Sequence, residues 1–152
     1  MPDEPAPATP PPGAPTTLNE AGELMLVDLE LSPLTKRTYR HGVHALLRFL
    51  HAQRGDDAAA DALAPCPIAW VDEEILAAFS RWLREAYPDP RQRPDEYGGL
   101  SPTRTTRTYL VAAKRLLNWL DLRDLLPPGV SYDRMLRRID QGRGHRRESY
   151  KK

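Results

Sequence analysis

Apolar residues recur at helical spacing in two long segments of the chain, residues 33–53 and residues 102–122. In the first segment they fall at Val43, Leu46, Leu47 and Leu50, and in the second at Leu110, Ala113, Leu116, Leu117 and Leu120. The i, i+3, i+4, i+7 spacing is that of one buried helical face. The pattern therefore predicts two amphipathic helices.

Both predicted helices open with the same residues. Leu31-Ser32-Pro33 is followed by Arg37-Thr38-Tyr39, and Leu100-Ser101-Pro102 is followed by Arg107-Thr108-Tyr109. A Ser side chain can accept hydrogen bonds from the free amides of a first turn, and Pro fits the first helical position. We expect each helix to begin at its Ser-Pro pair, and the first to end at Arg54-Gly55, where Gly is a natural stop.

Three further helices are shorter. The first is expected at about 18–31, with apolar residues at Leu24, Val27 and Leu31. The second is expected at about 72–86, with Asp72 as its cap and apolar residues at Ile75, Leu76, Phe79, Trp82 and Leu83. The third is expected at about 131–141, with apolar residues at Tyr132, Met135, Leu136 and Ile139. Proline-rich breaks at 65–67, 88–99 and 127–129 separate the helices. No segment alternates like a strand. The predicted class is all-α, a small bundle of four to five helices, with Trp70, Trp82 and Trp119 in its core.

The chain divides into three parts by composition. Seven of the 16 prolines lie in the first fifteen residues, so residues 1–17 are expected to be a disordered Pro-rich arm. Residues 18–141 form the helical domain. Residues 142–152 are basic, contain Gly and lack an apolar stripe, which predicts an extended linker.

Charge is segregated along the chain, although the net charge is only +1. Residues 32–54 hold five bases and no acid, and residues 101–152 hold thirteen bases and five acids. Residues 1–31 hold six acids and no Lys or Arg, and residues 55–100 hold ten acids and four bases. Both long helices fall in basic segments, so the near-neutral total does not exclude a nucleic-acid partner.

The first turns of the two long helices combine basic and hydroxyl side chains with the partial positive charge of a helix N-terminus, which favours phosphate. The candidate DNA-binding residues are Thr35, Lys36, Arg37, Arg40, His44, Thr103, Arg104, Thr105, Arg107, Thr108, Lys114 and Arg115, with Arg146 and Arg147 from the basic linker. The alternative for each is a solvated charge, or a helix cap in the case of Thr35 and Thr105.

The sequence gives little indication of a membrane segment, a metal site or an enzyme active site. No stretch has the roughly 20 consecutive apolar residues of a membrane span, and no signal peptide is recognisable, so a soluble, cytoplasmic protein is expected. Cys66 is the only cysteine, which predicts neither a disulfide nor a metal cluster. His41 and His44 lack a third metal ligand nearby. There is no phosphate-binding Gly-rich loop, so no cofactor and no standalone enzyme are expected.

The order of these motifs resembles the N-terminal core-binding domain of tyrosine recombinases, the phage integrase family. The resemblance covers about residues 18–140 and rests on Leu31-Ser32-Pro33-Leu34-Thr35, Tyr39, Phe49-Leu50, Val71-Asp72, Phe79, Trp82-Leu83, Leu100-Ser101-Pro102, Thr105, Leu110, Leu116-Leu117 and Trp119-Leu120. It implies a SAM-like helical bundle whose second and fourth helices cross and present their N-terminal halves to the major groove of double-stranded DNA.

The family's catalytic residues are not recognisable in this chain. Tyr150 lies in the basic segment, and the third residue after His145 is Glu148 where the family's His-x-x-Arg motif has Arg. The resemblance therefore implies a non-catalytic fragment, monomeric when isolated, whose parent protein carries out DNA integration or recombination with other protomers in a synaptic complex. A helical protein–protein interaction module without a DNA role remains the alternative.

Overall fold

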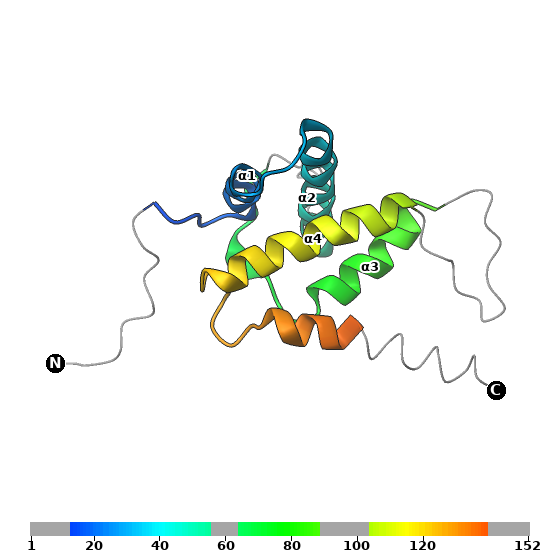
Figure 1. Cartoon of the computed structure of the whole chain (residues 1–152). Coiled ribbons are helices and arrows are strands. Elements are labelled where there is room, and N and C mark those ends of the chain that lie inside the picture. Colours follow the sequence, from blue (N-terminus) through cyan, green and yellow to red (C-terminus); the bar gives the residue numbers. More distant parts are fainter. Residues whose placement is uncertain (1–12, 56–63, 89–103, 140–152) are drawn as a thin grey trace.

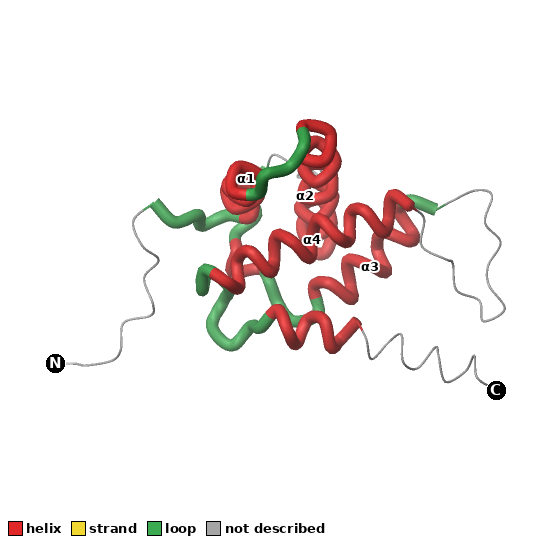
Figure 2. Tube along the Cα trace, in the orientation of Figure 1, coloured by secondary structure: helices red, strands yellow, loops and turns green. Residues whose placement is uncertain are grey.

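The computed structural model describes residues 13–55, 64–88 and 104–139. Its elements are α1 (Leu18–Asp28), α2 (Pro33–Gln53), the short 3-10 helix η2 (Ile68–Trp70), α3 (Ile75–Ala86) and α4 (Arg104–Leu122), and residues 132–139 are also helical. Within these ranges there is no strand, only an isolated bridge between Thr17 and Pro67 (Figure 2). The predicted all-α class is confirmed.

α4 occupies the centre of the bundle and packs against α1, α2 and α3. Figure 1 shows α2 crossing α4, with α1 beside α2 and the helix at residues 132–139 at the opposite end of the molecule from the start of α2. The predicted crossing of the second and fourth helices is present.

The ends of α2 agree with the sequence prediction. The Ser32 side chain accepts a hydrogen bond from the Thr35 amide at 3.2 Å, and Pro33 is the first helical residue. At the other end, Gly55 adopts a φ of +70°, a conformation that residues with a Cβ rarely adopt. Local chemistry alone therefore sets both boundaries of this helix.

The core contains the predicted apolar faces of α2, α3 and α4. Phe79 is completely buried, and its ring lies 5.5 Å from Phe49 and 6.0 Å from Trp82, measured between centroids. The three tryptophans, all predicted to lie in the core, differ in burial. Trp119 is buried, whereas Trp70 and Trp82 are partly buried at the edge of the core.

α2 and α4 approach each other closely where Gly42 of α2 faces Ala112 of α4. A Cβ atom added to Gly42 would lie 2.6 Å from Cβ of Ala112 and 3.2 Å from Cα of Tyr109. Such distances are too short for ordinary packing, so only glycine fits at this point of α2. The close approach fixes how the N-terminal halves of the two helices lie relative to each other.

The predicted apolar face of the first helix is wrong. Leu24 and Val27 are 42% and 76% exposed, whereas the buried residues are Leu18, Ala21, Gly22, Met25 and Leu26. Small residues allow the close approach, since a Cβ on Gly22 would lie 2.9 Å from Val43 Cγ1. The helix also ends at Asp28, short of the expected Leu31.

Two other expectations change in detail. α3 begins at Ile75 and not at Asp72, because the Asp72 carboxylate accepts from the Glu74 amide and caps the turn that precedes the helix. The segment after Pro67 forms η2, which the sequence did not predict, and its position is fixed by backbone hydrogen bonds from Leu18 to Cys66 and from Ile68 to Thr16.

Candidate nucleic-acid interface

Five of the predicted DNA-binding cations form no ion pair with any residue that the structure describes. Four of these side chains are exposed, and that of Lys36 is partly exposed. They lie on α2 and α4 and are called the basic surface: Lys36, Arg37, Arg104, Arg107 and Arg115. Neither helix has an acid in its first turn.

The basic surface is organised around the crossing of α2 and α4. Lys36 lies six residues before Gly42, and Arg104 lies eight residues before Ala112. At 1.5 Å per residue, these positions are roughly 9 and 12 Å from the crossing along their helix axes. The N-terminal halves of both helices therefore extend from the same point of contact (Figure 1).

Most other arginines in the described residues have structural partners. Arg123 pairs with Asp28 at 2.6 Å and covers the Trp119 ring, Arg48 donates to the Tyr87 hydroxyl at 2.7 Å, and Arg54 covers the Trp70 ring. Arg81 of α3 is exposed and, within the described ranges, has no ion pair. Unpaired basic charge is thus concentrated on α2 and α4.

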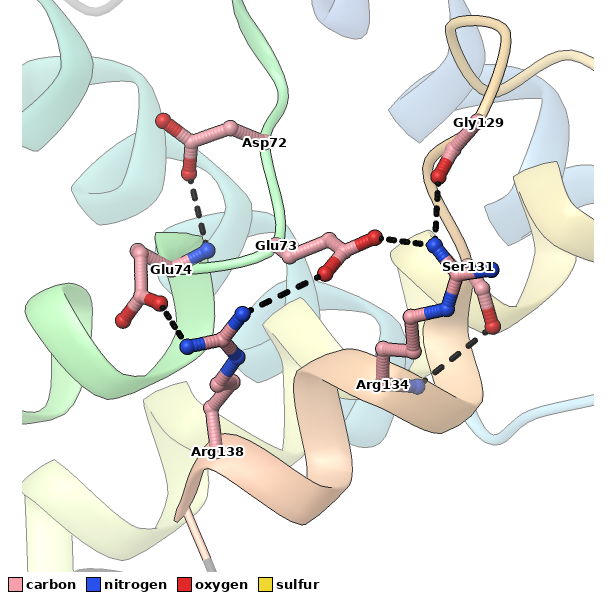
Figure 3. Close-up of polar contacts among 7 residues, drawn as sticks. All are labelled: Asp72, Glu73, Glu74, Gly129, Ser131, Arg134 and Arg138. Carbon is pink, nitrogen blue, oxygen red and sulfur yellow. Dashed lines mark hydrogen bonds and ion pairs between the residues drawn. The ribbon is translucent and has the colours of Figure 1, made fainter.

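The arginines of the helix at residues 132–139 form ion pairs, unlike those of the basic surface (Figure 3). Arg134 pairs with Glu73 at 2.7 Å and donates to the Gly129 carbonyl, and Arg138 pairs with Glu74 at 3.0 Å. These contacts tie residues 132–139 to the start of α3. Part of the basic charge of residues 101–152 is therefore structural and is neutralised by acids distant in the sequence.

Arg40 differs from the neighbouring cations that the sequence analysis grouped with it. Its guanidinium donates to both carboxylate oxygens of Glu23 on α1, at 2.9 and 3.0 Å. The hydrogen bond and the charge of Arg40 hold the pKa of Glu23 below its ordinary value of 4.5. Burial lowers the pKa of His44 below 6.5, with the Glu23 charge acting in the opposite direction. The acid-free face expected for α2 is therefore interrupted by Glu23.

Glu23→Gln is expected to strengthen DNA binding about twofold to threefold, because one negative charge beside Arg40 and His44 disappears. The ion pair is solvent-exposed, so the free energy of unfolding should fall by less than about 1 kcal/mol at neutral pH. Since folding lowers the pKa of Glu23, its contribution is present above pH 4.5 and is lost as pH falls further.

The measurements are fluorescence anisotropy with duplex DNA and urea unfolding at neutral and acidic pH. Glu85→Gln, which removes an exposed acid from α3, is the matched control and should leave DNA affinity unchanged. An equal gain in both variants would mean that Glu23 acts only through net charge.

The predicted threonines take different positions. Thr108 donates its hydroxyl group to the carbonyl of Arg104 on its own helix, and Thr38, which was not a candidate, makes the same bond to Leu34. The Thr35 hydroxyl accepts from Ser32, so Thr35 belongs to the capped turn, while Thr105 is exposed. The buried Thr106 was not singled out by the sequence analysis.

Two exposed apolar side chains lie among the cations. Leu34 is 73% exposed in the first turn of α2, and Val111 is 41% exposed between Arg107 and Arg115 on α4. Val111 follows Arg104 by seven residues and precedes Arg115 by four, so the three side chains share one side of α4. Apolar groups at such positions can contact thymine methyl groups in a major groove.

Several predicted residues lie outside the described residues, namely Thr103, Arg146, Arg147, His145 and Tyr150. Within the described part, no cluster of three or more His, Cys, Asp or Glu side chains suits a metal ion. Burial raises the pKa of the Cys66 thiol to about 12, so the thiol stays protonated at neutral pH. None of the helices described has the length and apolar character needed to cross a bilayer.

Comparison with known proteins found no matching family model, no matching curated protein and no matching solved structure.

Proposed function

We propose that this chain is the core-binding domain of a site-specific tyrosine recombinase of the phage integrase type, and that it binds duplex DNA through the N-terminal halves of α2 and α4. The observation that carries the proposal is the basic surface, whose cations form no ion pairs with described residues while most other arginines are engaged. The domain has no catalytic role. Strand cleavage belongs to a separate domain of the parent protein.

The placement of the cations supports a phosphate ligand on energetic grounds. A positive side chain in the first turn of a helix is repelled by the partial positive charge of the helix terminus, at a cost of roughly 0.3–1 kcal/mol. Lys36 and Arg37 in α2, and Arg104 and Arg107 in α4, all lie near helix starts that lack acids. A bound phosphate would convert this unfavourable arrangement into a favourable one.

Phosphate contacts and base contacts have different roles in this proposal. Lys36, Arg37 and Arg107 bind phosphates and fix the position of the domain, which requires no particular sequence. Arg104 and Arg115 flank the exposed Val111 on α4, so this helix combines donors for guanine with an apolar group for thymine. α4 is therefore the element assigned to sequence reading, and α2 the main anchor.

The test is fluorescence anisotropy of the wild-type chain with a short labelled duplex at increasing salt concentration. If Lys36, Arg37 and Arg107 contact phosphates, the plot of log affinity against log salt should have a slope of about −3. Absence of binding even at about 50 mM salt, where electrostatic binding is strong, would refute the proposed function.

A protein-interaction module is the second candidate, and one observation favours it. Leu24 and Val27 lie one turn apart on α1 and are both exposed, with Val27 76% exposed. Sedimentation without DNA distinguishes the two proposals, because an interaction module that associates through this face would form dimers that Val27→Ser abolishes. The DNA-binding proposal predicts a monomer and salt-sensitive association with duplex.

A further inference from the structure

α2 and α4 are similar over more than their opening residues. Residues 37–50 and 107–120 align without a gap and are identical at Arg37/Arg107, Thr38/Thr108, Tyr39/Tyr109, Leu46/Leu116, Leu47/Leu117 and Leu50/Leu120. Burial also corresponds at every aligned pair except 40/110 and 45/115. The two helices are therefore structural copies of one another in this bundle.

The two copies meet at equivalent positions. Gly42 and Ala112 are the sixth residues of the aligned segments, and they are the residues in contact at the crossing. When the same position of two equivalent elements makes the contact, an approximate two-fold axis runs through that contact, as in an isologous dimer interface. α2 and α4 thus form a pseudo-symmetric pair within one chain.

The pseudo-symmetry includes one pair of cations of the basic surface, Arg37 and Arg107. Arg37 and Arg107 each lie five residues before the crossing, about 7.5 Å along their helix axes, and both are exposed. Thr38 and Thr108 make the same hydroxyl-to-carbonyl bond, at 3.0 and 2.9 Å. The axis therefore relates one Arg-Thr-Tyr set on α2 to a matching set on α4.

Duplex DNA has the same kind of symmetry, because its antiparallel backbones are related by local two-fold axes perpendicular to the helix axis. Proteins with two-fold symmetry bind DNA by aligning their axis with such a dyad. We infer that α2 and α4 contact opposite strands of one duplex, with the Arg37 set on one backbone and the Arg107 set on the other. This inference rests on the proposed DNA-binding function and adds its geometry.

The experiment compares two duplexes of the same sequence, one with two natural strands and one in which a single strand has a neutral methylphosphonate backbone. Wild type, Arg37→Ala, Arg107→Ala and the double variant are titrated against each by anisotropy. On the natural duplex, each single substitution should weaken binding by a similar factor, roughly fivefold, and the effects should multiply in the double variant.

On the half-neutral duplex, the account predicts a different pattern. On this duplex the wild-type chain contacts the charged strand through only one of its two Arg-Thr-Tyr sets. Either single variant can therefore bind the charged strand through its intact set. Its affinity should fall by no more than about the twofold statistical factor. Only the double variant should lose the full affinity that one arginine contributes.

If both sets contact the same strand, each single substitution weakens binding to the half-neutral duplex as much as to the natural one, and the inference is wrong. Failure of the proposed function is a separate result, because the wild-type chain then fails to bind the natural duplex at all.

Discussion

Replacing both Lys36 and Arg104 with alanine should weaken binding to a short duplex by roughly 10- to 100-fold and make the salt slope about one unit shallower, because only Lys36 is assigned to a phosphate. These two residues lie on different helices, in the starts of α2 and α4, and neither forms an ion pair with any described residue. Their removal therefore costs the fold little. Anisotropy measured at several salt concentrations gives both quantities.

The matched control removes the same charge from the other end of the molecule. Arg137→Ala with Arg138→Ala lowers the net charge by two as well, on the helix at residues 132–139, where the arginines pair with Asp133, Glu73 and Glu74. Its DNA affinity should stay within about twofold of wild type, apart from long-range effects that salt screens. Equal losses in both double variants would show that net charge, not the basic surface, governs binding.

Gly42→Ala should destabilise the fold by about 1–2 kcal/mol, although alanine is normally the better helix former by about 1 kcal/mol. The added Cβ would stand 2.6 Å from Cβ of Ala112, with the Tyr109 backbone at 3.2 Å, so the two helices must move apart. Urea unfolding followed by circular dichroism measures the loss.

The double variant with Gly42→Ala and Ala112→Gly provides the control. It exchanges the two side chains across the crossing, so the close Cβ–Cβ contact disappears and the helix propensities of the two changes cancel. Its stability should return to within about 1 kcal/mol of wild type, whereas Ala112→Gly alone costs about 1 kcal/mol. Additive losses in the double variant would contradict the packing derived for this contact.

Features set by neighbouring residues could be predicted from the sequence. The start of α2 follows from Ser32-Pro33 and its end from Gly55, and both boundaries agree with the structure. The buried faces of α2 and α4 also follow from spacing, because each helix buries a continuous stripe. The candidate cations on these helices were identified in the same way, as the polar residues that the stripe leaves outside.

Features that depend on distant parts of the chain could not be predicted. α1 buries Ala21, Gly22 and Met25 and leaves Leu24 and Val27 exposed, and Gly22 lies close to Val43 of α2, a contact between two helices that the spacing within α1 does not reveal. Arg40 gave no local sign of its partner, since Glu23 lies seventeen residues earlier on another helix. The pairing of Arg134 with Glu73 spans sixty-one residues, so only the fold separates structural arginines from available ones.

The most direct test of a shared DNA surface on α2 and α4 is a titration of the isotope-labelled chain with duplex DNA, followed by amide chemical shifts in two-dimensional NMR spectra. The account predicts that amides of residues 35–39 and 104–109 shift together, with one common midpoint, while those of residues 132–139 stay in place. Shifts confined to one of the two helix starts, or centred on residues 132–139, would contradict it.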